Sequence, residues 1–147
     1  METEQVLNKR KFFRVYLDTP LCSEITISKI DDKKIDSSST KICVNDIGPG
    51  GLLFTSNLKF PVNDSVVFEF YIKLLDQTIR IEGIIVRQIL WKNDLSQYGV
   101  NFEMNDSKRE HLVRILNELA IRLKNKRFLV NSSICTKKDI VRCLKQR

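Results

Sequence analysis

Apolar and polar residues alternate along much of the first hundred positions of the chain. The alternation is clearest over residues 66–73, where Val66, Phe68, Phe70 and Ile72 stand at every second position. A period of two is the pattern of a strand that buries one face. It predicts strands at residues 21–30, 42–47, 52–55, 66–73, 79–91 and 98–102. Short turns join them without intervening helices, so we expect a mainly β fold, a six-stranded antiparallel β-barrel, rather than βαβ units.

Several breaks in the pattern predict how the strands are connected. Residues 1–14 form a polar, then basic arm, and residues 31–41 form a solvated loop rich in Asp, Lys and Ser. Asp76-Gln77 and Asn93-Asp94 indicate chain reversals. Gly83, inside a strand pattern, indicates a bulge or a close approach of another backbone.

The period changes after Met104, where a helical pattern begins. Ser107-x-x-Glu110 is a capping box, and apolar residues then recur at three-to-four spacing. These residues are Leu112, Ile115, Leu116, Leu119 and Leu123. We expect a C-terminal α-helix over 107–127 that completes a domain of residues 1–127. A basic helical tail, residues 128–147, follows, with a second short helix over 136–146.

Composition restricts the class of protein and its location. A chain of 147 residues with 42% hydrophobic and 29% charged residues is typical of one globular domain. It has no membrane-length apolar stretch and no signal peptide, so we expect a cytoplasmic protein without a membrane span. The four cysteines form no Cys-x-x-Cys pair and there is one histidine, so we expect buried thiols, with no metal site and no disulfide framework.

The net charge of +7 favours an anionic partner. Part of this excess lies in the tail, where a run of lysines and arginines is also what a solvated face would carry. The charge therefore indicates the sign of a ligand but does not identify it.

Two motifs together describe a site for a phosphorylated purine. Arg10 and Arg14 stand four residues apart, and Asp46 opens the glycine-rich turn that runs to Gly51. Arginine binds phosphate or the O6/N7 edge of guanine through two parallel hydrogen bonds, and it also stacks on bases. A glycine-rich turn lets backbone N–H groups approach a ligand.

These motifs resemble the signatures of the PilZ domain, a family of bacterial receptors for cyclic di-GMP. Arg10 and Arg14 match the family's Arg-x-x-x-Arg, and Asp46 and Gly51 match the ends of its (Asp/Asn)-x-Ser-x-x-Gly turn. The segments 83–87 and 98–102 resemble two further strands of the family. Gly48 stands where the family usually has Ser, so a hydroxyl is missing. The resemblance covers residues 8–105 and implies a non-enzymatic cyclic di-GMP receptor.

The resemblance implies six ligand-binding residues, each of which also has a structural explanation. They are Arg10, Arg14, Asp46, Gly48, Gly51 and Arg87. Asp46 suits the N1–H and N2–H₂ donors of guanine, although an aspartate before a turn also caps it. The two motif arginines could instead form an exposed basic arm. Arg87 suits either the ligand or a surface ion pair.

We therefore expect a receptor that changes conformation on binding cyclic di-GMP and signals to a protein partner. The partner would contact the C-terminal helix, and a homodimer is also considered. The process would be motility, adhesion or exopolysaccharide control. One alternative is a small basic barrel that binds single-stranded nucleic acid, which is disfavoured. Another is a PilZ-like protein-interaction module without a ligand. The sequence contains no nucleophile, base and orienting group in a catalytic pattern, so an enzyme is not expected.

Overall fold

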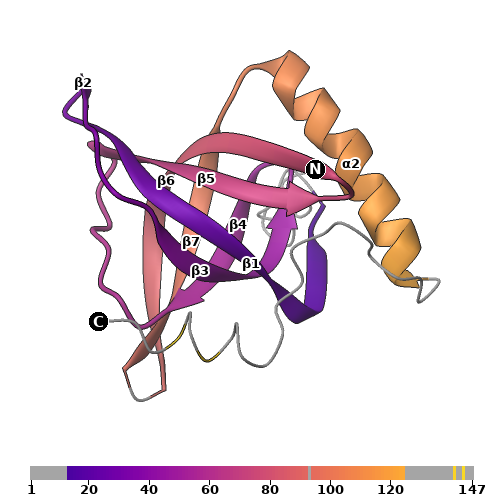
Figure 1. Ribbon diagram of the computed structural model, residues 1–147, viewed down its shortest axis with the longest axis horizontal. Coiled ribbons are helices and arrows are strands. Elements are labelled where there is room, and N and C mark those ends of the chain that lie inside the picture. The colour runs from indigo at the N-terminus through magenta and orange to yellow at the C-terminus, as the bar shows by residue number, and fades with distance from the viewer. Residues whose placement is uncertain (1–12, 93, 125–140, 142–143, 145–147) are drawn as a thin grey trace, which may run out of the picture.

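The computed structural model describes residues 13–92, 94–124, 141 and 144. Seven strands and one helix make up this part of the chain (Figure 1). The strands are β1 (Val15–Ile30), β2 (Lys33–Lys34), β3 (Thr40–Gly48), β4 (Gly51–Ser56), β5 (Val66–Leu74), β6 (Gln77–Lys92) and β7 (Leu95–Glu103). The helix is α2 (Asp106–Lys124).

Six of the strands close into an antiparallel barrel, as the sequence predicts. They pair in the order β1-β3-β4-β7-β6-β5, and β5 pairs with β1 again. The long strand β1 makes closure possible because it pairs with β3 from Val15 to Ile25 and with β5 from Glu24 to Ile30. The predicted mainly β, six-stranded barrel is therefore confirmed.

Two tight turns shape the hairpins at the edge of the barrel. Leu75 and Asp76 connect β5 to β6, and both have positive φ angles, 48° and 70°. Asp31 and Asp32, with φ angles of 51° and 66°, connect β1 to β2. Positive φ at both central residues matches the twist of a two-residue hairpin. The solvated loop expected over 31–41 is thus correct only in part: these residues are mostly exposed, but β2 pairs with the end of β1 and β3 begins at Thr40.

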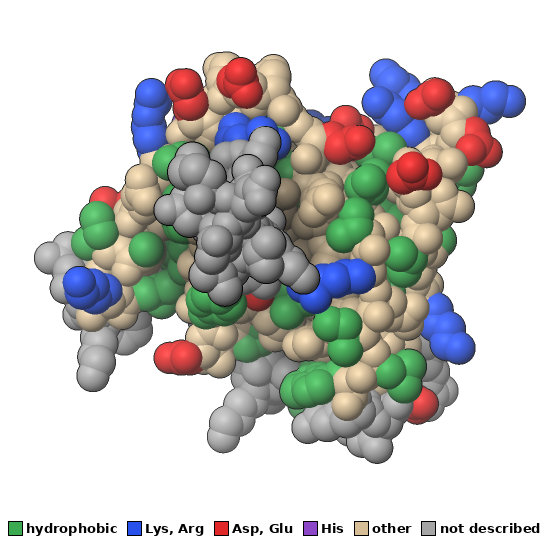
Figure 2. Space-filling view, turned by 180° about the vertical axis from the view of Figure 1, so that it is seen from behind, with side chains coloured by type: hydrophobic (Ala, Val, Ile, Leu, Met, Phe, Trp, Pro, Cys, Tyr) green, Lys and Arg blue, Asp and Glu red, His purple; other side chains and the backbone are tan. Residues whose placement is uncertain are grey.

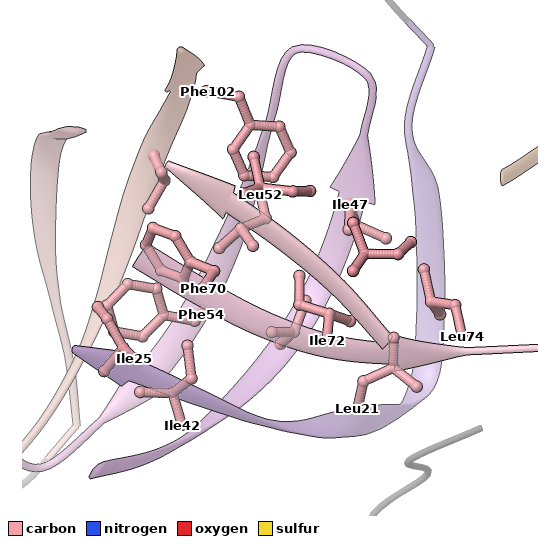
Figure 3. Close-up of a cluster of buried hydrophobic side chains, with 14 of the residues drawn as sticks. Leu21, Ile25, Ile42, Ile47, Leu52, Phe54, Phe70, Ile72, Leu74 and Phe102 are labelled. Carbon is pink, nitrogen blue, oxygen red and sulfur yellow. The ribbon is translucent and has the colours of Figure 1, made fainter. Parts of the chain in front are cut away.

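The barrel interior is filled by aliphatic and aromatic side chains. Leu21, Ile42, Leu52, Phe54 and Phe70 are among the completely buried residues of this cluster (Figure 3). The ring of Phe54 stacks on Tyr98 with the centroids 5.1 Å apart. The hydroxyl of Tyr98 donates to the carbonyl of Leu58, so its polar end is satisfied despite burial.

Helix α2 extends this core. It lies beside the barrel (Figure 1), and Leu112, Ile115, Leu116 and Leu119 are buried in the same cluster as the strands. Leu123, the fifth residue of the predicted stripe, packs against that cluster. The stripe is covered by the chain's own barrel, so the reason for expecting a partner on that side of the helix does not hold.

The start of α2 differs from the predicted capping box. The helix begins at Asp106, and the side chain of Asn105 accepts a hydrogen bond from the N–H of Lys108 at 2.8 Å. Asn105 is therefore the N-cap, two residues before the predicted Ser107. Among helices in the described ranges, none is long and apolar enough to cross a membrane.

Gly83 marks a close approach rather than a bulge. A Cβ at this position would lie 2.8 Å from the carbonyl oxygen of Asn101 and 2.9 Å from Val100 Cγ1. The irregularities of β6 lie further on, between Ile85 and Arg87 and between Leu90 and Lys92. Glycine is needed here because β7 leaves no room for a side chain.

Candidate functional site

The strand register places the predicted site on the outer surface of the barrel. Asp46 pairs with Leu53, Leu53 with Gly99, and Gly99 with Arg87, across β3, β4, β7 and β6. The neighbouring row, from Ile47 through Leu52 and Val100 to Ile85, is buried in the core. Side chains alternate along a strand, and the irregularities between Val44 and Asp46 in β3 and between Ile85 and Arg87 in β6 each shift the alternation by one residue, so the row that begins at Asp46 points outward.

An ion pair stands at one end of this row. Arg14 Nη1 donates to Asp46 Oδ1 at 2.5 Å, and the side chains of Arg14 and Asp46 are only 15% and 6% exposed. Arg14 directly precedes β1, and its neighbour Val15 pairs with Ile47 beside Asp46. A charge-assisted bond at so little exposure is much stronger than a surface ion pair. The pair fixes the guanidinium above the start of the glycine-rich turn.

Gly48 lies directly beneath the backbone that carries Arg14. A Cβ built on Gly48 would overlap the carbonyl oxygen of Phe13 and would lie 3.5 Å from the Cα of Arg14. Its φ angle is not positive, so glycine is required here by space and not by backbone conformation. The missing family hydroxyl at this position therefore has a structural cause, because a serine would push residues 13 and 14 away from the sheet.

The rest of the turn is held by β7 and by the helix. A Cβ on Gly51 would overlap the carbonyl oxygen of Val100, and the N–H of Phe102 donates to the carbonyl of Gly50 at 2.9 Å. Arg109 Nε donates to the carbonyl of Pro49 at 3.3 Å. The role of Arg109 was not predicted, because nothing in the sequence relates the first turns of α2 to a loop sixty residues earlier.

Arg87 lies over a third glycine at the other end of the row. A Cβ on Gly99 would stand 2.6 Å from Arg87 Nε and 2.8 Å from its Cγ, so the arginine side chain occupies the space that a larger residue would fill. Gly99 was not predicted as a site residue, because its contact with Arg87 follows from the register of β6 and β7. Both predicted site arginines that the structure describes thus lie against a glycine, Arg14 with its backbone and Arg87 with its side chain.

Of the six predicted ligand-binding residues, the structure brings five to this surface. They are Arg14, Asp46, Gly48, Gly51 and Arg87; we call these five residues together with Gly99 the arginine–glycine face. The predicted Arg10 lies outside the described residues. Adjacent strands are about 4.8 Å apart, so the three strand spacings from Asp46 to Arg87 amount to about 14 Å along the sheet.

Phe13, which precedes Arg14, is not part of the core. Its side chain is 42% exposed, and Phe12 lies outside the described residues. Within the described ranges, no group of three or more His, Cys, Asp or Glu side chains is placed to hold a metal ion.

A second polar surface, which we call the Glu69 groove, lies on β1, β5 and β6. It encloses about 480 Å³ and includes Glu69, Tyr71 and Arg80. Tyr71 donates to Glu69 at 2.6 Å, and Arg80 lies 3.4 Å from the same carboxylate and 5.4 Å from the centre of the Tyr71 ring. The hydrogen bond to Glu69 raises the pKa of Tyr71. Arg80, unlike Arg14, remains 64% exposed.

Comparison with known families agrees with this fold and motif arrangement. The PilZ domain family model matches residues 8–118, so the chain belongs to the PilZ domain family. The match extends into α2, beyond the segment on which the sequence resemblance rested. A comparison with curated proteins finds no match.

Several solved structures share the fold at low sequence identity. The Bacillus subtilis inhibitor of motility (MotI/DgrA) is 18% identical, with a TM-score of 0.55 over 82% of this chain and 54% of its own. MrkH of K. pneumonia in its apo state is 14% identical, with a TM-score of 0.58 over 78% of this chain and 53% of its own. YcgR of Escherichia coli, in complex with c-di-GMP, is 14% identical, with a TM-score of 0.52 over 81% and 49%. This chain therefore spans about half the length of each of these proteins.

Proposed function

We propose that the arginine–glycine face binds cyclic di-GMP and that the chain is a receptor for this second messenger. The observation that carries the proposal is the Arg14–Asp46 ion pair, held above Gly48 on the outside of the barrel. It joins the arginine motif to the turn motif, which are thirty-two residues apart in sequence. Membership of the PilZ family and a structural neighbour determined with c-di-GMP support the choice of ligand.

The two members of the ion pair suit different parts of the ligand. Cyclic di-GMP has two phosphates and two guanines, so it needs cationic donors and also an acceptor for the guanine N1–H and N2–H₂ groups. Arg14 and Arg87 supply planar donors for phosphate, for O6/N7 and for stacking. The carboxylate of Asp46 has two oxygens, and it can accept from a guanine through one while it retains Arg14 through the other.

The ion pair is also compatible with the alternative, a PilZ-like interaction module without a ligand. Arg14 and Asp46 already satisfy one another, so the site is electrostatically balanced when it is empty. A ligand must therefore offer more than one charged contact to compete, as a molecule with two phosphates does. A single phosphate on a mononucleotide does not meet that requirement.

A nucleic-acid-binding barrel is less well supported. On the face of the molecule shown in Figure 2, lysine and arginine side chains are interspersed with acidic ones and do not line one groove. Binding of single-stranded nucleic acid depends on a continuous positive groove with stacking aromatics.

The proposed output is a change in the surface that a protein partner contacts. Ligand bound to Arg14 and Asp46 would alter the surface around Phe13 and Arg14, which directly precede β1. Because the apolar side of α2 is buried, a partner or a second copy would meet its exposed side, where Ile121 is 50% exposed. The process controlled, whether motility, adhesion or exopolysaccharide production, would depend on that partner.

Isothermal titration calorimetry with the full chain tests the proposal. Cyclic di-GMP should bind, with a stoichiometry of one or two ligands per chain, whereas GMP and a single-stranded oligonucleotide at the same concentrations should bind far more weakly. Equally tight binding of cyclic di-GMP and GMP would remove the case for a two-phosphate site. Tighter binding of the oligonucleotide would favour the nucleic-acid alternative.

A further inference from the structure

Two cysteines that are distant in sequence lie directly opposite one another on the barrel. Cys22 of β1 and Cys43 of β3 are cross-strand partners in the antiparallel register. Their neighbours Leu21 and Val44 pair in the core, so both cysteine side chains point to the outer surface. The two side chains pack against one another, together with Leu144.

This arrangement has the spacing that a disulfide requires. Directly opposed residues of an antiparallel pair have Cα atoms about 4.5 Å or about 5.5 Å apart, depending on their hydrogen bonding. Disulfides span Cα separations of about 4.4–6.8 Å. Either kind of cross-strand pair therefore falls within the range, and no strand has to move far to bring the sulfurs together. In the structure both residues are thiols.

The two thiols differ in access to solvent. Cys43 is only 1% exposed, while Cys22 is partly exposed. Leu144 packs against Cys43 and contributes to this cover. A reagent in solution therefore meets Cys22 before Cys43. This order of access is that of an attacking and a resolving cysteine.

We propose that Cys22 and Cys43 form a dithiol site that low-molecular-weight disulfides oxidise to an intramolecular disulfide. The Cys22 thiolate attacks one sulfur of the small disulfide, forms a mixed disulfide and releases one thiolate. The Cys43 thiol then loses its proton to solvent and attacks the Cys22 sulfur, which forms the Cys22–Cys43 bond and releases the second small thiol. The protein loses two electrons and two protons, and the small disulfide gains them. The new bond joins β1 to β3, the strands beside the Arg14–Asp46 pair.

The test uses the full chain with Cys135→Ser and Cys143→Ser, which keeps the other thiols out of the reaction. The folded protein is incubated with glutathione disulfide at about pH 8.5, where about half of an ordinary cysteine is thiolate. It is then alkylated, digested with trypsin and mapped by mass spectrometry. Cleavage at the lysines and arginines should release a linked pair of peptides, Val15–Lys29 and Ile42–Lys59.

Two single substitutions separate the proposed roles. In the same background, Cys43→Ser should stop at a glutathione adduct on Cys22, because the resolving thiol is gone. Cys22→Ser should leave Cys43 unmodified, because it is buried. The proposal is overturned if the parent protein carries glutathione on both cysteines without a link, if neither reacts, or if Cys22 bonds to a second chain. It is also overturned if Cys43 reacts equally well without Cys22 in protein that remains folded.

Discussion

The barrel carries two surfaces on which an arginine pairs with a carboxylate, and they differ in their surroundings. On the arginine–glycine face, Arg14 and Asp46 are 15% and 6% exposed, and the backbone of Arg14 crosses Gly48. In the Glu69 groove, Arg80 is 64% exposed and lies over the ring of Tyr71. Gly48 lets the first pair lie close to the sheet, whereas in the second pair Glu69 is 20% exposed and its partner Arg80 stays largely in water.

This difference assigns different roles to similar residues. An exposed pair is screened by water and contributes little to stability. A pair that is mostly buried holds its geometry, and removal of one partner leaves a charge with little access to water. A preorganised arginine also binds a ligand at a smaller entropic cost. The proposed ligand site is therefore the first surface, and Arg80 provides the matched control.

The largest expected effect is on stability. Asp46→Ala should lower the free energy of unfolding by about 3 kcal/mol, near the lower limit for a buried pair because Arg14 keeps some contact with water. Arg80→Ala should cost less than about 1 kcal/mol. Urea unfolding of both variants measures the contrast. Equal losses of unfolding free energy would show that the two pairs stabilise the protein equally, despite their different burial.

The next effect is on affinity for cyclic di-GMP. Arg14→Ala should weaken binding by about 1.5–3 kcal/mol, or roughly tenfold to more than a hundredfold, because a charge-assisted contact is lost. Arg80→Ala should leave the dissociation constant unchanged. Titration calorimetry below the melting temperature of each variant separates lost contacts from unfolding. Unchanged binding by Arg14→Ala would remove this arginine from the site.

Gly48→Ser tests why the family serine is missing. From the sequence alone, a restored family hydroxyl would be expected to tighten binding if the backbone tolerates a side chain, but the structure predicts the opposite. The new Cβ would overlap the carbonyl of Phe13, and such overpacking typically costs about 1–3 kcal/mol of stability. Gly48→Ala should lose as much as Gly48→Ser, since the Cβ is the cause. Thermal melts of both variants decide the matter, and a fully stable Gly48→Ser that binds more tightly would restore the earlier prediction.

The smallest effect concerns the glycine under Arg87. Gly99→Ala should displace the arginine side chain and weaken cyclic di-GMP binding by about 0.5–1.5 kcal/mol, or twofold to tenfold. If Gly99→Ala acts through Arg87, it should cause no further loss of affinity in an Arg87→Ala background. A calorimetric double-mutant cycle measures this coupling. Additive losses would show that Gly99 acts independently of Arg87.

The sequence predicted the barrel because alternation reports directly which face of each strand is buried. It missed the first six residues of β1, where Asp18, Thr19 and Pro20 interrupt the pattern and the register shifts between Tyr16 and Leu21. It placed the cap of α2 at Ser107 because Asn105 and Ser107 are both good capping residues. The sequence near a helix start does not show which of two such neighbouring residues is the N-cap.

The site was predicted only in part, for a physical reason. Motif spacing identified Arg14 and Asp46, but their contact depends on the pairing of β1 with β3, which a sequence pattern does not specify. Gly99 and Arg109 contact residues of the candidate site that are close to them only in the folded chain. The opposed cysteines were missed likewise, since their twenty-one-residue separation resembles no known motif.

Glycine amides provide the most direct test of the central claim, that cyclic di-GMP binds over the arginine–glycine face. The chain has five glycines, of which Gly48, Gly51 and Gly99 belong to this face, while Gly83 is buried against β7. In the NMR spectrum of the full chain labelled with ¹⁵N-glycine, addition of cyclic di-GMP should shift the amide signals of Gly48, Gly51 and Gly99 and leave Gly83 nearly unchanged. Binding in calorimetry without shifts at these three glycines would place the ligand elsewhere and contradict the account.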